Sequence, residues 1–205
     1  MKKLYLLSVW LFALSFVACN ESEDLGKYEN WQARNEAFID SLQQVFDAKT
    51  DPELEALEYR RNKKYIIFYK KIVSAPDGER PFFTSTVFCY YRGMFIDEAV
   101  FGAAPGTAYY TTLYEQLTVF DKNTMKHGYD PTPFDSPALF NIKSFYTSSV
   151  GVVPAWADIL EHMRVGERWE VYIPWQAAYG ASGYNNIPGY STLIFDIILY
   201  RIDEK

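Results

Sequence analysis

The sequence predicts an α+β protein in which an antiparallel β-sheet curls over one short α-helix, preceded by an N-terminal helical extension. Three observations lead to this prediction. Apolar residues recur at helical spacing within residues 28–62, long β-prone runs occupy 65–96 and 167–202, and a single short helical segment begins near residue 156. Strands followed by one late helix are typical of a sheet packed over that helix.

Residues 1–18 have the features of a secretory signal peptide. Lys2 and Lys3 supply positive charge, and the apolar run 4–17 is too short for a permanent membrane-spanning helix. Residues 16–19 resemble a lipobox, in which cleavage precedes a cysteine that is then acylated. Cys19 is therefore the expected lipidation site, and an ordinary cleaved signal is the alternative.

The acylated cysteine and an acidic tether are expected to span residues 19–27. Residues 20–24 carry three acids and no apolar side chain, which predicts a solvated spacer. Asn20 does not match the aspartate that retains lipoproteins at the inner membrane. The expected location is the cell envelope, with a lipid anchor in the outer membrane and either the periplasmic or the surface face.

The helical extension is expected to span residues 28–64. Its apolar side chains recur at steps of seven, four and three residues and so share one helix face. Asp51-Pro52 resembles a second helix start, and Leu54 and Leu57 continue the spacing. We expect a packing appendage; dimerisation through this extension is the alternative. The residues of the shared face are Trp31, Phe38, Leu42 and Val45.

Residues 65–205 are expected to form the main domain. Its first strands lie at 65–73 and 82–96, separated by the turn Ala-Pro-Asp-Gly at 75–78. Gly and Pro punctuate 121–137, which predicts a loop. The remaining elements are expected as strands at 138–142, 167–174 and 192–202 and a helix at 156–163.

Composition limits the functions open to this chain. The net charge of −6 offers no electrostatic reason to expect nucleic acid as a partner. His127 and His162 are the only histidines, and neither has further ligands at metal-binding spacing, so no metal is expected. The aromatic share of 18% suits a β-rich domain with an aromatic pocket.

Several short motifs in the C-terminal half occur together in a fixed order. In that order and spacing they resemble the FKBP-type peptidyl-prolyl cis-trans isomerases, and Tyr-Arg-Gly-Met at 91–94 resembles the tyrosine-bearing strand of that family. The N-terminal helical region has no counterpart in the minimal domain. The motifs are Val-Val-Pro-Ala-Trp at 152–156, Met-Arg-Val-Gly-Glu-Arg-Trp at 163–169, Ile-Pro at 173–174, Ala-Tyr-Gly at 178–180 and Ile-Pro-Gly-Tyr-Ser-Thr-Leu-Ile-Phe-Asp at 187–196.

The resemblance implies isomerisation of Xaa–Pro bonds in exported proteins, with proline-containing polypeptides as partners and no cofactor. Rotation about the amide bond must break its resonance, against a barrier of about 20 kcal/mol. An apolar pocket favours the twisted amide over the more polar planar one, and no nucleophile is required.

The resemblance also assigns roles to individual residues. Trp156 forms the floor of the pocket, and the Tyr179 hydroxyl donates a hydrogen bond to the substrate. The substrate backbone meets the N–H of Val153. The remaining lining residues are Val152 beside Val153, Tyr91 and Phe195 closing the pocket, and Ile187 in a neighbouring loop.

The resemblance further implies a Phe-Asp pair whose carboxylate meets the Tyr91 hydroxyl. Phe120-Asp121 and Phe134-Asp135 are the two candidates. Phe120-Asp121 is preferred because it ends a β-like run and leaves a full loop before the strand at 138–142. This choice implies an insertion at about 97–116, and it makes Phe120 a substrate-binding residue with Tyr91, Asp121 and Tyr179 as the catalytic set.

Two departures from the family pattern affect the shape of the pocket. Ala138 stands where a large side chain is usual, and residues 144–149 are additional. One alternative is a module of the same fold that binds proline-containing chains, as a chaperone, without catalysis. A second is a glycan-binding surface lipoprotein, which would need exposed, coplanar aromatic rings.

Overall fold

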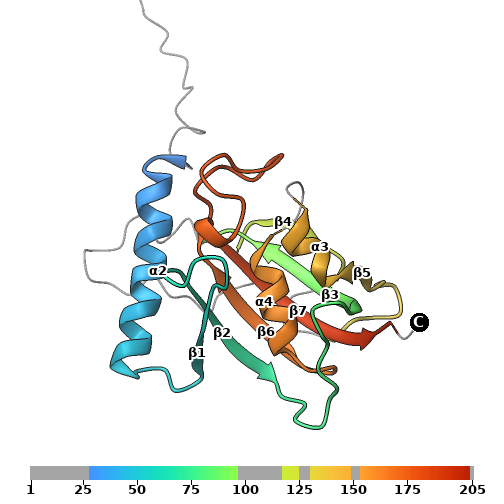
Figure 1. The fold of residues 1–205 in the computed structure, drawn as a ribbon. Helices are drawn as coiled ribbons and strands as arrows, with labels where there is room; N and C mark the ends of the chain where they lie inside the picture. The colour runs from blue at the N-terminus through green and yellow to red at the C-terminus, as the bar shows by residue number, and fades with distance from the viewer. Residues whose placement is uncertain (1–27, 97–116, 125–129, 149–152, 204–205) are drawn as a thin grey trace, which may run out of the picture.

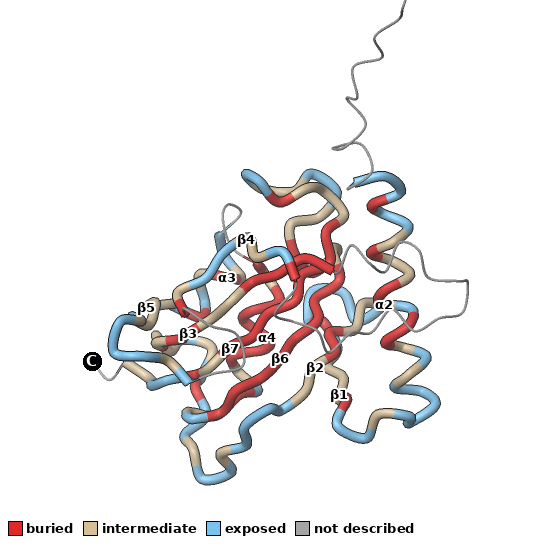
Figure 2. Tube along the Cα trace, turned by 180° about the vertical axis from the view of Figure 1, so that it is seen from behind, coloured by how far each residue is buried: buried red, intermediate tan, exposed pale blue. Residues whose placement is uncertain are grey.

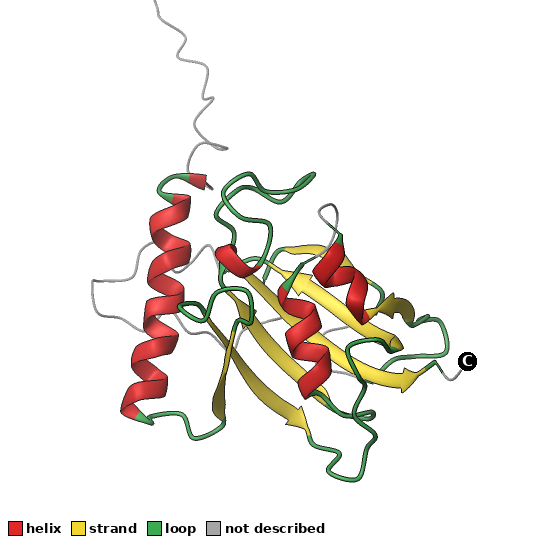
Figure 3. Cartoon of the chain, viewed as in Figure 1, coloured by secondary structure: helices red, strands yellow, loops and turns green. Residues whose placement is uncertain are grey.

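A computed structural model describes residues 28–96, 117–124, 130–148 and 153–203. These residues form one antiparallel sheet with helices on both of its faces (Figures 1 and 3). The expected signal peptide, Cys19 with its tether, Val152 and the insertion at 97–116 lie outside the described residues. The strands are β1 (Leu54–Glu58), β2 (Ile66–Val73), β3 (Thr86–Met94), β4 (Val119–Lys122), β5 (Ala138–Asn141), β6 (Arg168–Ile173) and β7 (Leu193–Ile202). The helices are α2 (Trp31–Ala48), α3 (Ile142–Thr147), α4 (Ala155–His162) and the 3₁₀ turn η3 (Trp175–Ala177).

The strands follow the order β1-β2-β6-β7-β3-β4, with β5 pairing to the other end of β3. Every pairing is antiparallel, as the sequence predicted. The expected strands at 65–73, 82–96, 138–142, 167–174 and 192–202 correspond to β2, β3, β5, β6 and β7, and the expected helix at 156–163 corresponds to α4. The α+β prediction is therefore confirmed.

Helices cover both faces of the sheet at its centre. Trp156 of α4 contacts Phe195 of β7, with ring centroids 5.1 Å apart, and Phe195 pairs with Val171 of β6. Adjacent residues in a strand point to opposite faces, so Tyr172 points away from α4. The Tyr172 ring lies 6.0 Å from that of Phe38 in α2. The two helices therefore lie on opposite faces, and every residue of β6 is buried, as the continuous red of β6 in Figure 2 illustrates.

Helix α2 uses the apolar face that the sequence predicted. Trp31, Phe38 and Leu42 are buried, and Val45 packs against the same core. Those side chains pack into the core of their own chain, and α2 itself runs along the left flank of Figure 1. None of the described helices is both long enough and apolar enough to cross a membrane.

The prediction that the helical extension continues to residue 64 was wrong beyond the end of α2. Residues 54–58 form β1, an edge strand that pairs with β2. Leu, Glu and Ala are strong helix formers, which explains why the local pattern favoured a helix. Pairing overrides that preference because Leu54 becomes buried and Glu55 accepts a 2.8 Å hydrogen bond from the Tyr69 hydroxyl on β2.

Candidate active site

A small pocket of about 80 Å³ opens above Trp156, between the two helices α3 and α4 and the neighbouring strands. Its walls are aromatic except for one aliphatic side chain and one carboxylate. The lining residues are Tyr91, Phe120, Asp121, Phe140, Phe145, Val153, Trp156, Tyr179 and Phe195.

Trp156 forms the centre of an aromatic cluster at the base of this pocket. Its side chain is 3% exposed and lies in the first turn of α4. The rings of Tyr91 and Phe195 meet it edge to face, with centroids 5.5 and 5.1 Å away. Phe145 stacks on it at 5.5 Å, and Phe140 lies tilted at 5.2 Å. Such packed rings leave an apolar floor from which water is excluded.

The Tyr91 hydroxyl donates a 2.9 Å hydrogen bond to the carboxylate of Asp121. Adjacent residues of a regular strand point to opposite faces, yet Phe120 and Asp121 both line the pocket. A β-bulge explains this arrangement: Gly93 pairs with Asp121 and Met94 with Val119, so Phe120 is the extra residue.

Asn123 and Gly93 stabilise the part of the pocket that contains Tyr91 and Asp121. The Asn123 side chain accepts a 2.6 Å hydrogen bond from the Tyr91 backbone N–H and donates one of 2.9 Å to the Cys89 carbonyl. Gly93 leaves room for two pocket rings, because a Cβ atom there would lie 2.5 Å from Phe120 and 2.7 Å from Phe195. Any larger residue at position 93 would push those rings apart.

Tyr179 enters the pocket from the segment that follows η3. Burial, and then the negative charge of Asp121, raise the pKa of Tyr179 to about 12. Burial and the hydrogen bond to Asp121 also raise the pKa of Tyr91. Both hydroxyls are therefore protonated at neutral pH. Among the described residues the Tyr179 hydroxyl has no hydrogen-bond partner, so its proton can be donated to a ligand.

The structure brings together seven of the nine residues assigned to the pocket from sequence. They are Tyr91, Phe120, Asp121, Val153, Trp156, Tyr179 and Phe195. Ile187 does not line the pocket; it is buried in the adjoining loop, where it forms a β-bridge with Tyr184. Tyr184 in turn stacks on Tyr179, with centroids 5.2 Å apart. Val152 lies outside the described residues.

The alternative pair, Phe134-Asp135, lies in a loop away from the pocket lining. Phe134 is 91% exposed, and the Asp135 carboxylate accepts a 2.7 Å hydrogen bond from the backbone N–H of Thr132. Asp121, and not Asp135, is thus the carboxylate at the Tyr91 hydroxyl.

Sequence reasoning missed Phe140 and Phe145 as lining residues. Phe140 was detectable, because alternation along a strand places it on the same face as Ala138, the position flagged as unusually small. Phe145 belongs to α3, which is formed by the segment that is additional to the family pattern. No local feature of the sequence indicates that this helix would direct a ring onto Trp156.

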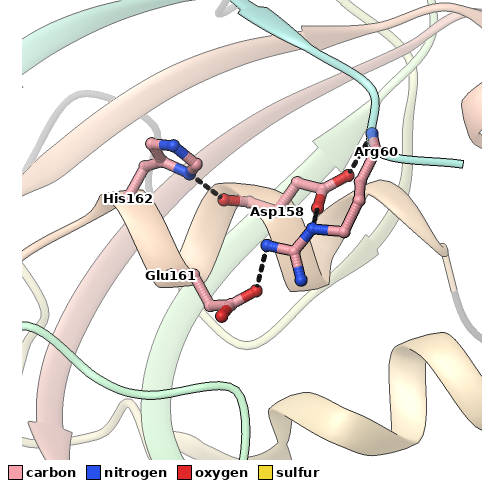
Figure 4. A network of polar contacts seen from close by, with 4 residues as sticks. All are labelled: Arg60, Asp158, Glu161 and His162. Carbon is pink, nitrogen blue, oxygen red and sulfur yellow. Dashed lines mark hydrogen bonds and ion pairs between the residues drawn. The ribbon is translucent and has the colours of Figure 1, made fainter. Parts of the chain in front are cut away.

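A network of charged and polar side chains holds the helix that carries Trp156 (Figure 4). Asp158 of α4 is 1% exposed, and its carboxylate lies 3.0 Å from Arg60 Nε while also accepting the Arg60 backbone N–H at 3.0 Å. The same guanidinium reaches Glu161, and His162 Nδ1 lies 2.7 Å from the Asp158 carbonyl. Burial raises the pKa of Asp158, and the Arg60 charge opposes that rise. Arg60 thus ties the turn after β1 to α4.

A curled antiparallel sheet over a short helix, with an aromatic pocket and a tyrosine–carboxylate pair at its rim, defines an FKBP-like domain. Residues 78–200, more than half of the chain, match the family model for FKBP-type peptidyl-prolyl cis-trans isomerase. The chain belongs to that family. Among the described residues, no group of three or more His, Cys, Asp or Glu side chains is placed to hold a metal ion.

Individual relatives are similar over the same region. The chain is 29% identical over 133 residues to the FKBP-type 22 kDa peptidyl-prolyl cis-trans isomerase of Escherichia coli, covering 64% of this chain and 48% of that protein. It is 31% identical over 135 residues to the outer membrane protein MIP of Legionella longbeachae, covering 65% and 43%. The chain thus spans less than half the length of either relative.

The solved structure of a peptidyl-prolyl cis-trans isomerase from Pseudomonas syringae has the same fold. It superposes with a TM-score of 0.53 and 21% identity, covering 84% of this chain and 96% of that one. At this identity the similarity concerns the fold alone.

Proposed function

We propose that this protein is a peptidyl-prolyl cis-trans isomerase that acts on Xaa–Pro bonds of exported proteins. The observation that carries the proposal is the aromatic pocket floored by Trp156, with the Tyr91–Asp121 pair at its rim. Such a pocket matches the chemistry of the reaction, which needs an apolar environment and a few hydrogen-bond donors rather than a nucleophile.

The reaction would proceed by differential stabilisation of the twisted amide. The prolyl ring packs against the Trp156 indole and the surrounding rings, which removes the amide from water. Twisting the C–N bond reduces the polarity of the amide, so the apolar pocket stabilises the twisted state relative to the planar one. The protonated Tyr179 hydroxyl donates a hydrogen bond to the substrate carbonyl and holds the peptide in place while the bond rotates.

A protease-coupled assay on short Xaa–Pro peptides tests this proposal. The wild-type chain should accelerate isomerisation above the uncatalysed rate. Tyr179→Phe and Asp121→Ala should each lower kcat/KM by about tenfold, the effect expected for the loss of one hydrogen bond to the bound substrate or its support. Asp135→Ala is the matched control, because that carboxylate lies outside the pocket lining and should leave the rate unchanged.

Two outcomes would contradict the proposal. A wild-type rate equal to the uncatalysed rate would exclude isomerase activity. A loss of activity in Asp135→Ala but not in Asp121→Ala would show that the wrong carboxylate had been assigned to the reaction.

A binding module without appreciable catalysis is the second candidate, and one observation favours it. Phe145 of the additional helix α3 stacks on Trp156 and narrows the pocket. Under this alternative a proline-containing peptide would bind without faster isomerisation. Glycan binding is less well supported: of the described tryptophans, Trp31, Trp156 and Trp169 are buried, and the half-buried Trp175 meets Tyr190 edge to face rather than in one plane.

We also propose that the protein is a lipoprotein of the cell envelope, acylated at Cys19 and anchored in the outer membrane. The proposal rests on residues 1–24 of the sequence, and the name of the Legionella relative, an outer membrane protein, supports it. The apolar face of α2 is buried in its own chain, so those side chains are not free to contact a second copy.

Metabolic labelling with a radioactive fatty acid tests the anchor. Label should enter the wild-type protein and be absent from Cys19→Ser, because the thiol is the only acceptor in the lipobox-like segment. Cys89→Ser, a change in the buried thiol of β3, is the matched control and should keep the label. Label retained in Cys19→Ser would exclude Cys19 as the site.

A further inference from the structure

Helix α2, in the N-terminal part of the chain, contacts a loop from the C-terminal part that borders the pocket. This pocket-side loop, residues 180–192, directly follows Tyr179, and Tyr184 within it stacks on the Tyr179 ring. The loop contains few regular hydrogen bonds of its own: Tyr190 donates to Gly180, and Tyr184 and Ile187 bond to each other. The position of this loop beside the pocket therefore depends on its contacts with other parts of the chain.

The first contact is a buried asparagine. Asn35 is 0% exposed, and its Oδ1 accepts a 2.7 Å hydrogen bond from the backbone N–H of Thr192. Its Nδ2 donates to the Trp31 carbonyl at 2.7 Å, and the Thr192 hydroxyl donates to the Asn35 carbonyl at 3.3 Å. A buried amide is costly unless both ends are paired, so the asparagine and the loop stabilise each other in this position.

The second contact is Trp31, which connects to the pocket by two routes. Its Nε1 donates a 3.0 Å hydrogen bond to the Ser191 hydroxyl of the loop. Its ring also meets Phe95 at 6.0 Å, and Phe95 lies 5.0 Å from Phe120, a residue of the pocket wall. One side chain of α2 thus supports both the loop and the wall.

The third contact is made by Glu36, the residue after Asn35. Glu36 Oε1 accepts a 3.3 Å hydrogen bond from Trp175 Nε1, and the Trp175 ring meets Tyr190 of the loop at 5.0 Å. Trp31 and Asn35, four residues apart, lie on one face of the first two turns of α2, and Glu36 is the residue that follows Asn35. The helix begins without a side-chain cap, since Asn30 makes no such bond, so these tertiary contacts also stabilise its first turn.

We infer that α2 positions the pocket-side loop, with Asn35 and Trp31 as positioning residues for Tyr179 and for the Phe120 wall. The catalytic consequence rests on the proposed isomerase function, whereas the loop geometry does not. Removing either contact should loosen the loop, displace Tyr179 and weaken the binding of peptide substrate.

The experiment compares Trp31→Phe and Asn35→Ala with the wild-type chain. Trp31→Phe keeps an aromatic ring beside Phe95 and removes the hydrogen bond to Ser191. In both variants the amide protons of Gly180, Tyr184, Ile187 and Tyr190, none of which bonds to α2, should exchange with solvent about tenfold faster, the scale of one lost buried hydrogen bond. In the peptide assay KM should rise and kcat/KM should fall by about tenfold.

Ser41→Ala is the matched control. Ser41 is buried on the same helix, but within the described part of the chain its hydroxyl bonds only to the Phe38 carbonyl of α2. This variant should keep wild-type exchange at the four loop amides and a wild-type KM.

Wild-type exchange at those amides in Trp31→Phe would overturn the inference, as would equal acceleration in Ser41→Ala. If Asn35→Ala does not fold, Trp31→Phe alone decides the matter. A wild-type chain without isomerase activity would refute the proposed function, while the exchange measurement would still decide whether α2 positions the loop.

Discussion

Replacing Trp156 with alanine should lower the free energy of unfolding by about 4 kcal/mol and abolish isomerase activity in the protein that remains folded. Removal of a buried tryptophan costs its transfer free energy and leaves a cavity, and the two together usually amount to about 3–5 kcal/mol. Here the indole contacts four other rings, so little of that cavity can be filled by local movement. Urea denaturation and the peptide assay measure the two effects.

Trp169→Ala is the control for this experiment. Trp169 is also buried, stacks on Tyr69 at 4.2 Å and belongs to the same core, but it does not line the pocket. The two variants should lose similar stability, and only Trp156→Ala should lose activity at a temperature where both are folded. Equal activity in the two variants would argue against Trp156 as the floor of a catalytic pocket.

Replacing Arg60 with methionine should lower the free energy of unfolding by about 2 kcal/mol at neutral pH. The Asp158 carboxylate would stay buried without its cationic partner, and breaking a buried pair in this way typically costs about 3–5 kcal/mol. The smaller figure allows for the 43% exposure of the Arg60 side chain, which screens the interaction. Thermal or urea denaturation of the two proteins measures the difference.

The loss in Arg60→Met should depend on pH in a defined direction. Burial raises the pKa of Asp158, and without Arg60 it would rise further above the unfolded value of about 3.9. When folding raises the pKa of a carboxyl group, its protonated form stabilises the folded state at pH values below the unfolded pKa. That contribution is lost as the pH rises through the folded pKa. The stability deficit of the variant should therefore be small near pH 4 and grow towards pH 7.

Lys63→Met provides the comparison for a surface charge. Lys63 pairs with Glu58 at 3.4 Å, but both side chains are more than half exposed, so this change should cost almost nothing at any pH. A deficit in Arg60→Met that did not change with pH would contradict the assignment of Asp158 as its source.

Trp156→Ala and Arg60→Met both act on α4, from opposite sides of that helix. Trp156 occupies the first turn of α4 and faces the pocket, whereas Asp158 lies two residues later and faces the turn after β1. The position of the pocket floor is thus linked to the edge of the sheet, and α2 supports the opposite rim through the pocket-side loop. The N-terminal segments 31–48 and 54–60 therefore contribute to the site although none of their residues lines it.

The fold class and most of the pocket could be predicted from the order and type of the amino acids alone. β-prone runs bounded by turn residues placed β2, β3, β6 and β7, because residue type and turn signals are local properties that a strand displays whatever its partner is. The ordered motifs between residues 152 and 196 placed Trp156, Tyr179 and Phe195 together, since they resemble a family in which those positions meet. Choosing Asp121 over Asp135 needed only the β-like run that ends at Phe120 and the spacing to the next strand.

The remaining features depend on contacts in the folded chain, and the reason is the same for each. Residues 54–58 have helical propensity and become a strand because β2 offers them a paired edge. Phe145 reaches Trp156 because α3 packs beside α4, and Asn35 is buried because Thr192, 157 residues away, supplies its partner. Each feature depends on the free energy of a contact between segments that are distant in the sequence. The residue pattern of one segment alone does not report that free energy.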